Sequence, residues 1–461
     1  MTFTMPPRTQ ADPEAAKPTG EQPTTLDDEF WGARAHLKHI RDAAHSRQRS
    51  APAVLGVTLA RIAAMVDHRL RIPPIVGADA GLSLITAVLA PPGVGKSTAS
   101  HIGSQLLPAP AGIDIADQLP IGTGEGMVEV FFDMLEEPDE VTGKPKKVKK
   151  QVRHNAFFYV DEGQVLSEIG TRKNATLLPT IRSAFTGATL GQMNASEERR
   201  RVLPAGSYTV GVVVALQTVL AGALLDDADG GTPQRMLWLP AIDTTIPDNP
   251  PVWPGLLPWQ PPNREAVNAL RDDGWLIGED AHLTVAESIQ REIRAADLRR
   301  ARGEETTVLL DAHEGLLRLK LAALLTILDG RLDISEEDWQ LAACLKEASN
   351  ETRDSVVEAV KQDSARREAE QSSRLARRAA QADVAVGERR VIDCSRKVAE
   401  KVWREPDRWT VAELRRSMSR WRDVLDEGVD HAVLEGWVVE KTEPGQGASK
   451  RLLRRGEKRP S

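Results

Sequence analysis

The sequence predicts an α/β fold, in which a mainly parallel sheet is followed by a helical region and a smaller C-terminal domain. Four apolar runs (82–90, 156–160, 208–216 and 236–241) are continuous rather than alternating, which is typical of parallel strands buried on both faces. Segments with helical spacing of apolar residues separate these runs, as βαβ units require. After position 388 the pattern changes to three helical segments and a two-strand hairpin, which is typical of a winged helix-turn-helix.

Changes in composition, Pro-rich segments and a helix-capping pattern divide the 461 residues further. A Pro-, Thr-, Glu- and Ala-rich beginning indicates disorder, and a Pro- and Trp-rich stretch (246–262) closes the sheet-containing part. Ser335 and Asp338 have the spacing of a capping box at the start of a long helix. In chain order, we expect a disordered tail (1–28), a helical segment packed on the core (29–76), an α/β core (77–262), a helical subdomain (263–350), a helical spacer (351–387), a winged-helix domain (388–455) and a tail (456–461).

Composition also argues against several classes of protein. The net charge of −7 is not that of a polycation that coats nucleic acid. The two cysteines, Cys344 and Cys394, are far apart, which excludes a disulfide framework or a Cys-based zinc site and suits a reducing cytoplasm. The N-terminus lacks an apolar core, so we expect no signal peptide. Gln217 and Thr218 interrupt the apolar stretch 208–225, which we interpret as a buried strand and a helix rather than a membrane span.

The first apolar run leads into a phosphate-loop motif. The pattern G-x-x-x-x-G-K-[ST] occurs here as A-x-x-x-x-G-K-S, and a helical pattern leaves the loop as the mechanism requires. Glycines let backbone N–H groups curl around phosphate oxygens. Lys96 would neutralise the β- and γ-phosphates, and the Ser97 hydroxyl would ligate Mg²⁺. The predicted ATP-binding residues are Ala90, Pro91, Pro92, Gly93, Val94, Gly95, Lys96, Ser97 and Thr98. The alternative is a plain Gly/Pro turn.

Acidic residues near this loop are candidates for metal binding and catalysis. Asp161, which follows the run 156–160, would join Ser97 in the magnesium shell, and its neighbour Glu162 would polarise the attacking water. Glu125 competes for the second role, because in RecA-like ATPases the water-activating glutamate can lie beyond the strand after the phosphate loop. We favour Glu162. The alternative for each acid is a structural role at a helix N-terminus.

Two further polar residues adjoin predicted strands. Gln217 ends the run 208–216 and would sense the γ-phosphate, because ligands bind at the carboxyl ends of strands in such sheets. Arg235 precedes the run 236–241 and would stabilise transition-state charge on a neighbouring subunit's γ-phosphate. A loop glutamine and a surface arginine in a turn are the alternatives.

Several segments together resemble a family of helicase-like P-loop ATPases that lie beside primase–polymerase modules on phages, plasmids and integrated elements of high-GC bacteria. The segments are FWGARAHLKHIRDAA, LAPPGVGKST, GTGEG, FFYVDEG, TLLPTIRSAFTGATLG, VALQ and GGTPQRMLWLP, within about Phe30 to Ala348. The resemblance implies a RecA-like core, Mg-ATP and a homo-oligomeric ring in which Arg235 acts across subunits. Ala90 stands where the motif usually has a glycine, and this departure concerns the affinity for the nucleotide rather than the chemistry. The chain has no primase motif, so a primase–polymerase would be a separate partner.

Two basic regions are candidates for contact with DNA. In a winged helix the third helix enters the major groove and the wing touches the backbone. The corresponding residues are Arg420, Arg422, Lys450 and Arg451. Asp and Glu residues crowd the same helix, so docking to a protein is the alternative. The densest basic run, KPKKVKKQVR, would form a hairpin that touches single-stranded DNA in the ring channel, with the flanking EEPDE held outside, or a merely solvated hairpin. Its candidate residues are Lys146, Lys147, Lys149 and Lys150.

Taken together, these features predict a cytoplasmic, ATP-dependent DNA motor, most simply a replicative helicase-like ATPase of a mobile element. A replication initiator or helicase loader that uses ATP as a switch is one alternative. A non-catalytic DNA-binding regulator with a decayed phosphate loop is the other.

Overall fold

The computed structural model describes residues 26–91, 95–138, 144–161, 176–193, 201–225, 227, 230–270, 280–304, 313–443 and 450–460. The chain divides into two compact units, Met1–Asp363 and Ser364–Ser461. The predicted residues Pro92, Gly93, Val94 and Glu162, and most of the expected disordered tail, lie outside the described residues.

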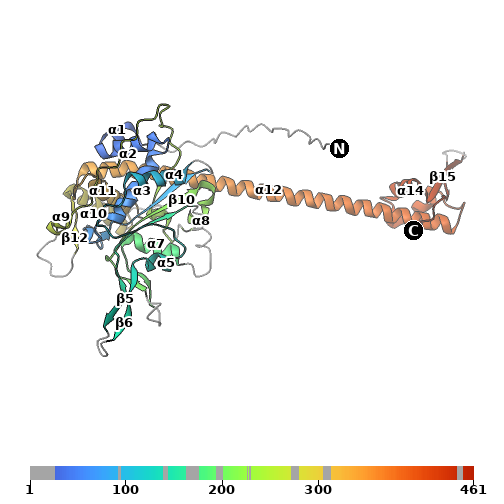
Figure 1. The fold of residues 1–461 in the computed structure, drawn as a ribbon. Helices are drawn as coiled ribbons and strands as arrows, with labels where there is room; N and C mark the ends of the chain where they lie inside the picture. The colour runs from blue at the N-terminus through green and yellow to red at the C-terminus, as the bar shows by residue number, and fades with distance from the viewer. Residues whose placement is uncertain are drawn as a thin grey trace, which may run out of the picture. The chain divides into compact units, whose positions relative to one another are not determined.

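Three N-terminal helices precede the sheet: α1 (Asp28–Gly32), α2 (Ala35–Ser46) and α3 (Ala51–Met65) (Figure 1). Helix α3 is apolar on nearly every side, and all its residues are buried. The Ser50 side chain caps its start by accepting a hydrogen bond from the backbone N–H of Ala53. At its end, the Asn155 amide donates to the carbonyl oxygens of Ala64 and Val66. Helix α3 therefore lies across the strands as the central helix of the first unit.

A five-stranded sheet forms the centre of this unit, with the strand order β11-β3-β10-β7-β4 and every pairing parallel. Its strands are β3 (Leu84–Ala90), β4 (Ile115–Leu119), β7 (Asn155–Val160), β10 (Thr209–Gln217) and β11 (Met236–Pro240). The predicted parallel sheet is thus confirmed. Strand β10, from the first part of the interrupted apolar stretch, lies between the strands that precede the phosphate loop and Asp161. No helix in the described part of the chain is long and apolar enough to cross a membrane.

Helices connect the strands of the sheet. They are α4 (Lys96–Leu106), α5 (Gly124–Glu129), α7 (Leu177–Thr186), the 3-10 helix η2 (Thr218–Leu220), α8 (Gly222–Leu225) and the 3-10 helix η4 (Pro233–Arg235). Two short strands, β1 (Leu70–Ile72) and β2 (Ala80–Gly81), precede β3 and belong to a separate three-stranded sheet. At the close approach of β10 to α3, a Cβ on Gly211 would lie 1.9 Å from the Ala60 carbonyl oxygen. Only glycine allows this packing.

Two antiparallel hairpins project from the sheet-containing unit: β5 (Phe132–Pro138) with β6 (Pro145–Gln151), and β8 (Leu190–Gln192) with β9 (Arg201–Leu203). Figure 1 shows the first hairpin extending beyond α5. The spacing of Met127, Phe131 and Leu135 predicts a helix over 124–137, but this is wrong in its second half, because α5 ends at Glu129 and the chain then pairs with β6. The cross-strand partners explain the difference: Glu136 and Glu137 lie opposite Lys147 and Lys146.

The helical region after the sheet contains α9 (Arg264–Ala269), β12 (Ala281–His282), β13 (Thr284–Val285), α10 (Glu287–Ala301), α11 (Glu314–Leu328) and β14 (Asp333–Ile334). Helix α11 anchors this region to the core. Its fully buried Lys320 donates hydrogen bonds to the carbonyl oxygens of Ser83, at 2.9 Å, and Phe185. Burial lowers the pKa of this ammonium well below its ordinary value.

Helix α12 (Glu336–Arg404) runs through the boundary between the two units. It begins with the predicted capping box, in which Ser335 N donates to the Asp338 carboxylate and Asp338 N donates to the Ser335 hydroxyl. The first of the three predicted helical segments after position 388, residues 391–405, corresponds to the end of α12, which continues from the predicted spacer without a break.

The second unit contains the end of α12 and four further elements, α13 (Val411–Ser417), α14 (Leu425–Leu434), β15 (Val438–Glu443) and β16 (Lys450–Arg455), besides the 3-10 helix η6 (Ser419–Trp421). It has its own buried cluster, which includes Cys394, Leu414, Val429, Trp437 and Leu453. The third predicted helix begins at Leu425 rather than Arg420, so the two arginines expected at its start lie before it.

Candidate nucleotide-binding site

The carboxyl ends of β3, β10 and β7 form one edge of the sheet, here called the phosphate edge and defined by Ala90, Gln217 and Asp161. Gln217 is the direct partner of Ala90 in the parallel pairing of β10 with β3. Val214 of the same strand pairs with Val160 of β7, which immediately precedes Asp161. The strand order thus gathers three sequence-predicted residues at adjacent strand ends, although 127 positions separate Ala90 from Gln217.

The described part of the phosphate loop supports the geometry that the motif predicts. Gly95 caps α4 with φ 78° and ψ 32°, a left-handed conformation that favours glycine. Helix α4 begins at Lys96 and directs its first free backbone N–H groups, and the positive end of its dipole, to this edge. Pro91 and Ser97 are exposed, and Thr98 is half-buried.

Asp161 is exposed at the end of β7 and belongs to a short hydrogen-bonded chain. The Tyr159 hydroxyl donates to Asp161 Oδ1 at 3.2 Å. Ser100, a buried residue of α4, hydrogen-bonds the same tyrosine. Burial and the Asp161 charge raise the pKa of Tyr159, which keeps it a neutral donor. Tyr159 and Ser100 therefore connect the acid to the helix that leaves the loop. Neither was among the residues predicted from the sequence, although Tyr159 stands two residues before Asp161, on the same face of its strand.

These positions can be tested against the needs of Mg²⁺. This ion takes few protein oxygens and completes its shell with phosphate oxygens and water. The Ser97 hydroxyl and the Asp161 carboxylate are both exposed at the phosphate edge, so the donor types fit. No group of three or more His, Cys, Asp or Glu residues that could hold a metal alone occurs among the described residues.

Glu125 lies at the start of α5. Among the described residues, its hydrogen bonds are to groups other than Ser97 and Asp161. Its carboxylate accepts from the Thr176 hydroxyl at 2.8 Å and from the Gln192 amide at 3.3 Å. Partial burial alone would raise the pKa of Glu125, but hydrogen bonds from its own backbone N–H and from Thr176 outweigh it and lower the pKa. The carboxylate is thus held ionised beside α7 and β8.

Arg235 lies at the opposite edge of the sheet. The next residue, Met236, pairs with Ile85 near the beginning of β3. About five residues of strand, roughly 16 Å, separate that position from Ala90. Within one subunit Arg235 is therefore remote from the phosphate edge.

A second arginine that sequence analysis missed, Arg182 of α7, lies near Arg235. Arg182 pairs with Asp227, while Arg235 Nη1 donates to the Gly231 carbonyl and its buried Nε has no hydrogen-bond partner among the described residues. Burial and the Arg182 charge lower the pKa of Arg235. Asp227 is the described carboxylate that acts on both guanidinium groups.

The basic hairpin is largely balanced by acids. Lys149 is 10% exposed and pairs with Glu129 at 2.6 Å. Lys150 pairs with Glu137 of β5. The expectation that the acidic stretch is held outside is wrong for Glu136 and Glu137, which lie in β5 directly opposite the lysines. Lys146 and Lys147 are exposed.

The predicted basic residues of the second unit likewise include one that is paired with acids and others that are exposed. Arg451 is held by Glu440 and by Asp430, at 2.7 Å and 3.3 Å from its Nη2, and these acids raise its pKa. Arg420, Arg422 and Lys450 are exposed and have no ion pair among the described residues. These three are the cations of the set best placed to meet a phosphate backbone.

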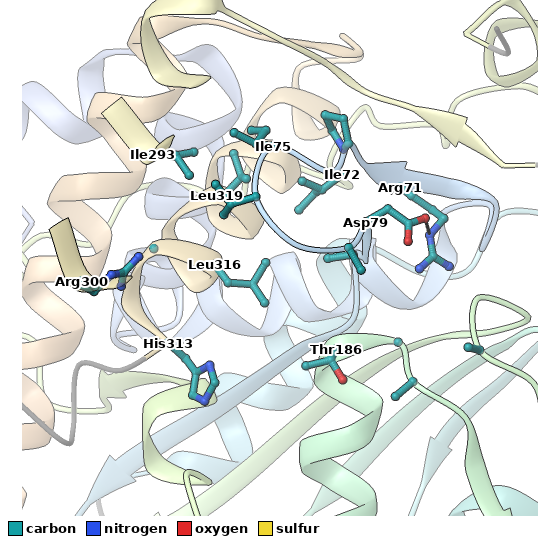
Figure 2. A pocket seen from close by; sticks show the side chains of 18 residues that line it. Arg71, Ile72, Ile75, Asp79, Thr186, Ile293, Arg300, His313, Leu316 and Leu319 are labelled. Carbon is teal, nitrogen blue, oxygen red and sulfur yellow. Dashed lines mark ion pairs between the residues drawn. The ribbon is translucent and has the colours of Figure 1, made fainter. Parts of the chain in front are cut away.

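An apolar cavity of about 490 Å³ lies elsewhere. Figure 2 shows the Arg71–Asp79 ion pair at its wall, with Ile72, Leu316 and Leu319 lining it. It adjoins the segment that leads into the amino end of β3, and no sequence-predicted site residue lines it.

Comparisons with known proteins add a distant likeness. No protein-family model and no curated protein matches this chain. A solved structure of a full-length MCM homolog from Methanopyrus kandleri matches with a TM-score of 0.36 and 13% identity, over 71% of this chain and 63% of that chain. The chain thus spans less than two thirds of that protein's length. The five-stranded parallel sheet and the loop at its edge fit a P-loop NTPase core.

Proposed function

We propose that this chain is an ATP-hydrolysing motor on DNA, of the helicase-like, RecA-like type found in phages and other mobile elements. One observation carries the proposal: the strand order brings the phosphate-loop helix, Gln217 and Asp161 to one edge of a parallel sheet. A plain Gly/Pro turn would not require an acid, an amide and a helix N-terminus at adjacent strand ends. Ligands of open α/β sheets bind at this edge.

The residues at the phosphate edge have distinct roles in the proposed site. The α4 N-terminus and Lys96 bind the β- and γ-phosphates, and Ser97 with Asp161 holds the metal. Bound Mg²⁺ supplies charge neutralisation on the phosphates. Glu162, or alternatively Glu125, orients the attacking water and accepts its proton, while Gln217 senses the γ-phosphate.

The position of Arg235 supports action between subunits. Because it lies at the amino edge of the sheet, it would serve a neighbouring copy in a homo-oligomeric ring rather than its own nucleotide. Arg182 would assist, since its guanidinium lies close enough to lower the pKa of Arg235.

Contacts with DNA are assigned to the exposed cations. The succession of α12, α13, α14 and the β15–β16 hairpin supports a winged helix that uses Arg420, Arg422 and Lys450. Lys146 and Lys147 of the β5–β6 hairpin would meet single-stranded DNA. Phosphate contacts of this kind give salt-dependent and weakly selective binding. In this proposal the protein works in the cytoplasm beside a separate primase–polymerase.

The test measures ATP hydrolysis with and without single-stranded DNA. Wild type should show Mg²⁺-dependent turnover that DNA stimulates, and Lys96→Ala and Asp161→Asn should each lower it by a factor of roughly 100 or more. Lys38→Ala, at an exposed lysine of α2, is the matched control and should retain turnover. Absence of turnover in wild type, with and without DNA, would remove the motor proposal.

A forked duplex separates the motor from a loader or initiator. A helicase opens the fork in an ATP-dependent way, whereas a loader hydrolyses ATP without opening it. In the same assay, Lys146→Ala with Lys147→Ala should reduce binding of single-stranded DNA and the slope of its salt dependence.

A further inference from the structure

The turn between α2 and α3 is fixed to the sheet beside the phosphate edge. The Ser50 hydroxyl donates to the carbonyl of Pro240, the last residue of β11, at 2.6 Å. The carboxylate of Asp243, just beyond that strand, accepts from Ala51 N at 3.0 Å and lies 3.1 Å from His45 Nε2. Strand β11 is the neighbour of β3, so this turn stands next to the strand that leads into the phosphate loop.

The turn places the Arg49 side chain directly on Gly95. A Cβ at position 95 would lie 2.6 Å from Arg49 Nε and 3.0 Å from its Cζ. The guanidinium therefore packs against the one residue whose left-handed backbone begins α4. This contact gives Gly95 a second reason to lack a side chain, besides its φ of 78°.

The Arg49 guanidinium is not satisfied within the described chain. It has five N–H donors. Nη1 donates to the Gln48 carbonyl at 2.8 Å, whereas the buried Nε has no hydrogen-bond partner among the described residues. No carboxylate lies within ion-pair distance of Arg49 in the described part of the chain. Arg49 is half-buried with its Nε enclosed, and both its guanidinium and the adjacent helix N-terminus favour an anion.

We propose that Arg49 binds the α/β-diphosphate of a nucleotide held in the loop of its own subunit, an inference that rests on the proposed ATP site. The backbone of a phosphate loop cradles the α- and β-phosphates, and Gly95 belongs to that backbone. A guanidinium packed on Gly95 reaches the same oxygens and forms charge-assisted hydrogen bonds with them. Because ATP and ADP share this diphosphate, Arg49 contributes equally to the binding of both.

The experiment measures equilibrium binding of fluorescent ATP and ADP analogues to the full chain with Mg²⁺. Arg49→Ala should weaken both nucleotides by a similar factor, roughly 10- to 100-fold. Arg49→Lys should recover part of the loss, because it retains charge without the planar fork. Arg47→Ala is the matched control: this exposed arginine of the same turn lies over the Trp253 ring, and its loss should leave both affinities unchanged.

The outcomes separate this inference from the proposed function. Equal affinities of wild type and Arg49→Ala overturn the inference while the ATP site stands. Loss of ATP binding with unchanged ADP binding also overturns it, because the contact is then with the γ-phosphate. If wild type binds neither nucleotide, the proposed function fails as well. Circular dichroism checks folding, and Arg49→Gln carries the same comparison if Arg49→Ala does not fold.

Discussion

Replacing Asp243 by asparagine tests how the N-terminal helices are attached to the sheet. The Asp243 side chain is 1% exposed and lies 3.1 Å from His45 Nε2. One carboxylate oxygen accepts from the backbone N–H of Ala51 at 3.0 Å, and the other accepts from the backbone N–H of Thr245 at 2.9 Å. These bonds lower the pKa of Asp243 against the opposing effect of burial.

Asparagine has the same shape but only one acceptor oxygen. The His45 ring and the Thr245 hydroxyl can change tautomer or rotate, whereas the two backbone N–H groups cannot. In either orientation of the amide, its NH₂ group therefore faces one backbone donor. An unsatisfied buried donor costs about 1–3 kcal/mol, and the remaining bonds lose their charge-assisted strength. We expect Asp243→Asn to lower the free energy of unfolding by about 2–4 kcal/mol.

Urea unfolding of the first unit, followed by circular dichroism, measures this loss. Asp248→Asn, at an exposed aspartate on the same segment, is the control and should change stability by less than about 0.5 kcal/mol. The wild-type contribution is fully present above the unfolded pKa of about 3.9 and is lost as the pH falls below it. The part of the pH dependence of stability that Asp243 contributes should disappear in Asp243→Asn. A loss of less than 1 kcal/mol would refute the hydrogen-bond argument.

Three further predictions concern other parts of the chain. Gly211→Ala should lower the free energy of unfolding by roughly 3 kcal/mol, measured by urea unfolding. The reason is that the new Cβ would lie 1.9 Å from the Ala60 carbonyl oxygen, while paired strands on both sides prevent β10 from moving away. A neutral effect would contradict that packing. Burial, chiefly, lowers the pKa of His68 to about 4. The free energy of unfolding should therefore fall by about 2 kcal/mol between pH 7 and pH 5, because the unfolded chain takes up a proton at this residue. In parallel urea titrations, His68→Gln should flatten this dependence of stability on pH. Thr410→Ala removes the capping box with Glu413 and should cost about 1 kcal/mol, seen as faster amide hydrogen exchange in α13; unchanged exchange would argue against the cap.

The sequence alone predicted the elements whose signals are local. Continuous apolar runs identified the buried parallel strands, because such strands need no polar face. The Ser335–Asp338 pattern marked the start of α12, since a capping box involves residues only three positions apart. The phosphate-loop motif is local for the same reason, and Gly95 within it has a left-handed backbone.

Only the tertiary structure decided which distant residues meet. The insertion of β10 between β3 and β7 places Gln217 beside Ala90, and no local pattern encodes that strand order. The segment 132–138 has helical spacing, yet it forms a strand because the lysines opposite it supply pairing and charge. Arg49 lies on Gly95 because Asp243 and Ser50 fix its turn to the sheet. Propensity acts over a few neighbouring residues, whereas a binding site depends on contacts that close only when the whole sheet has formed.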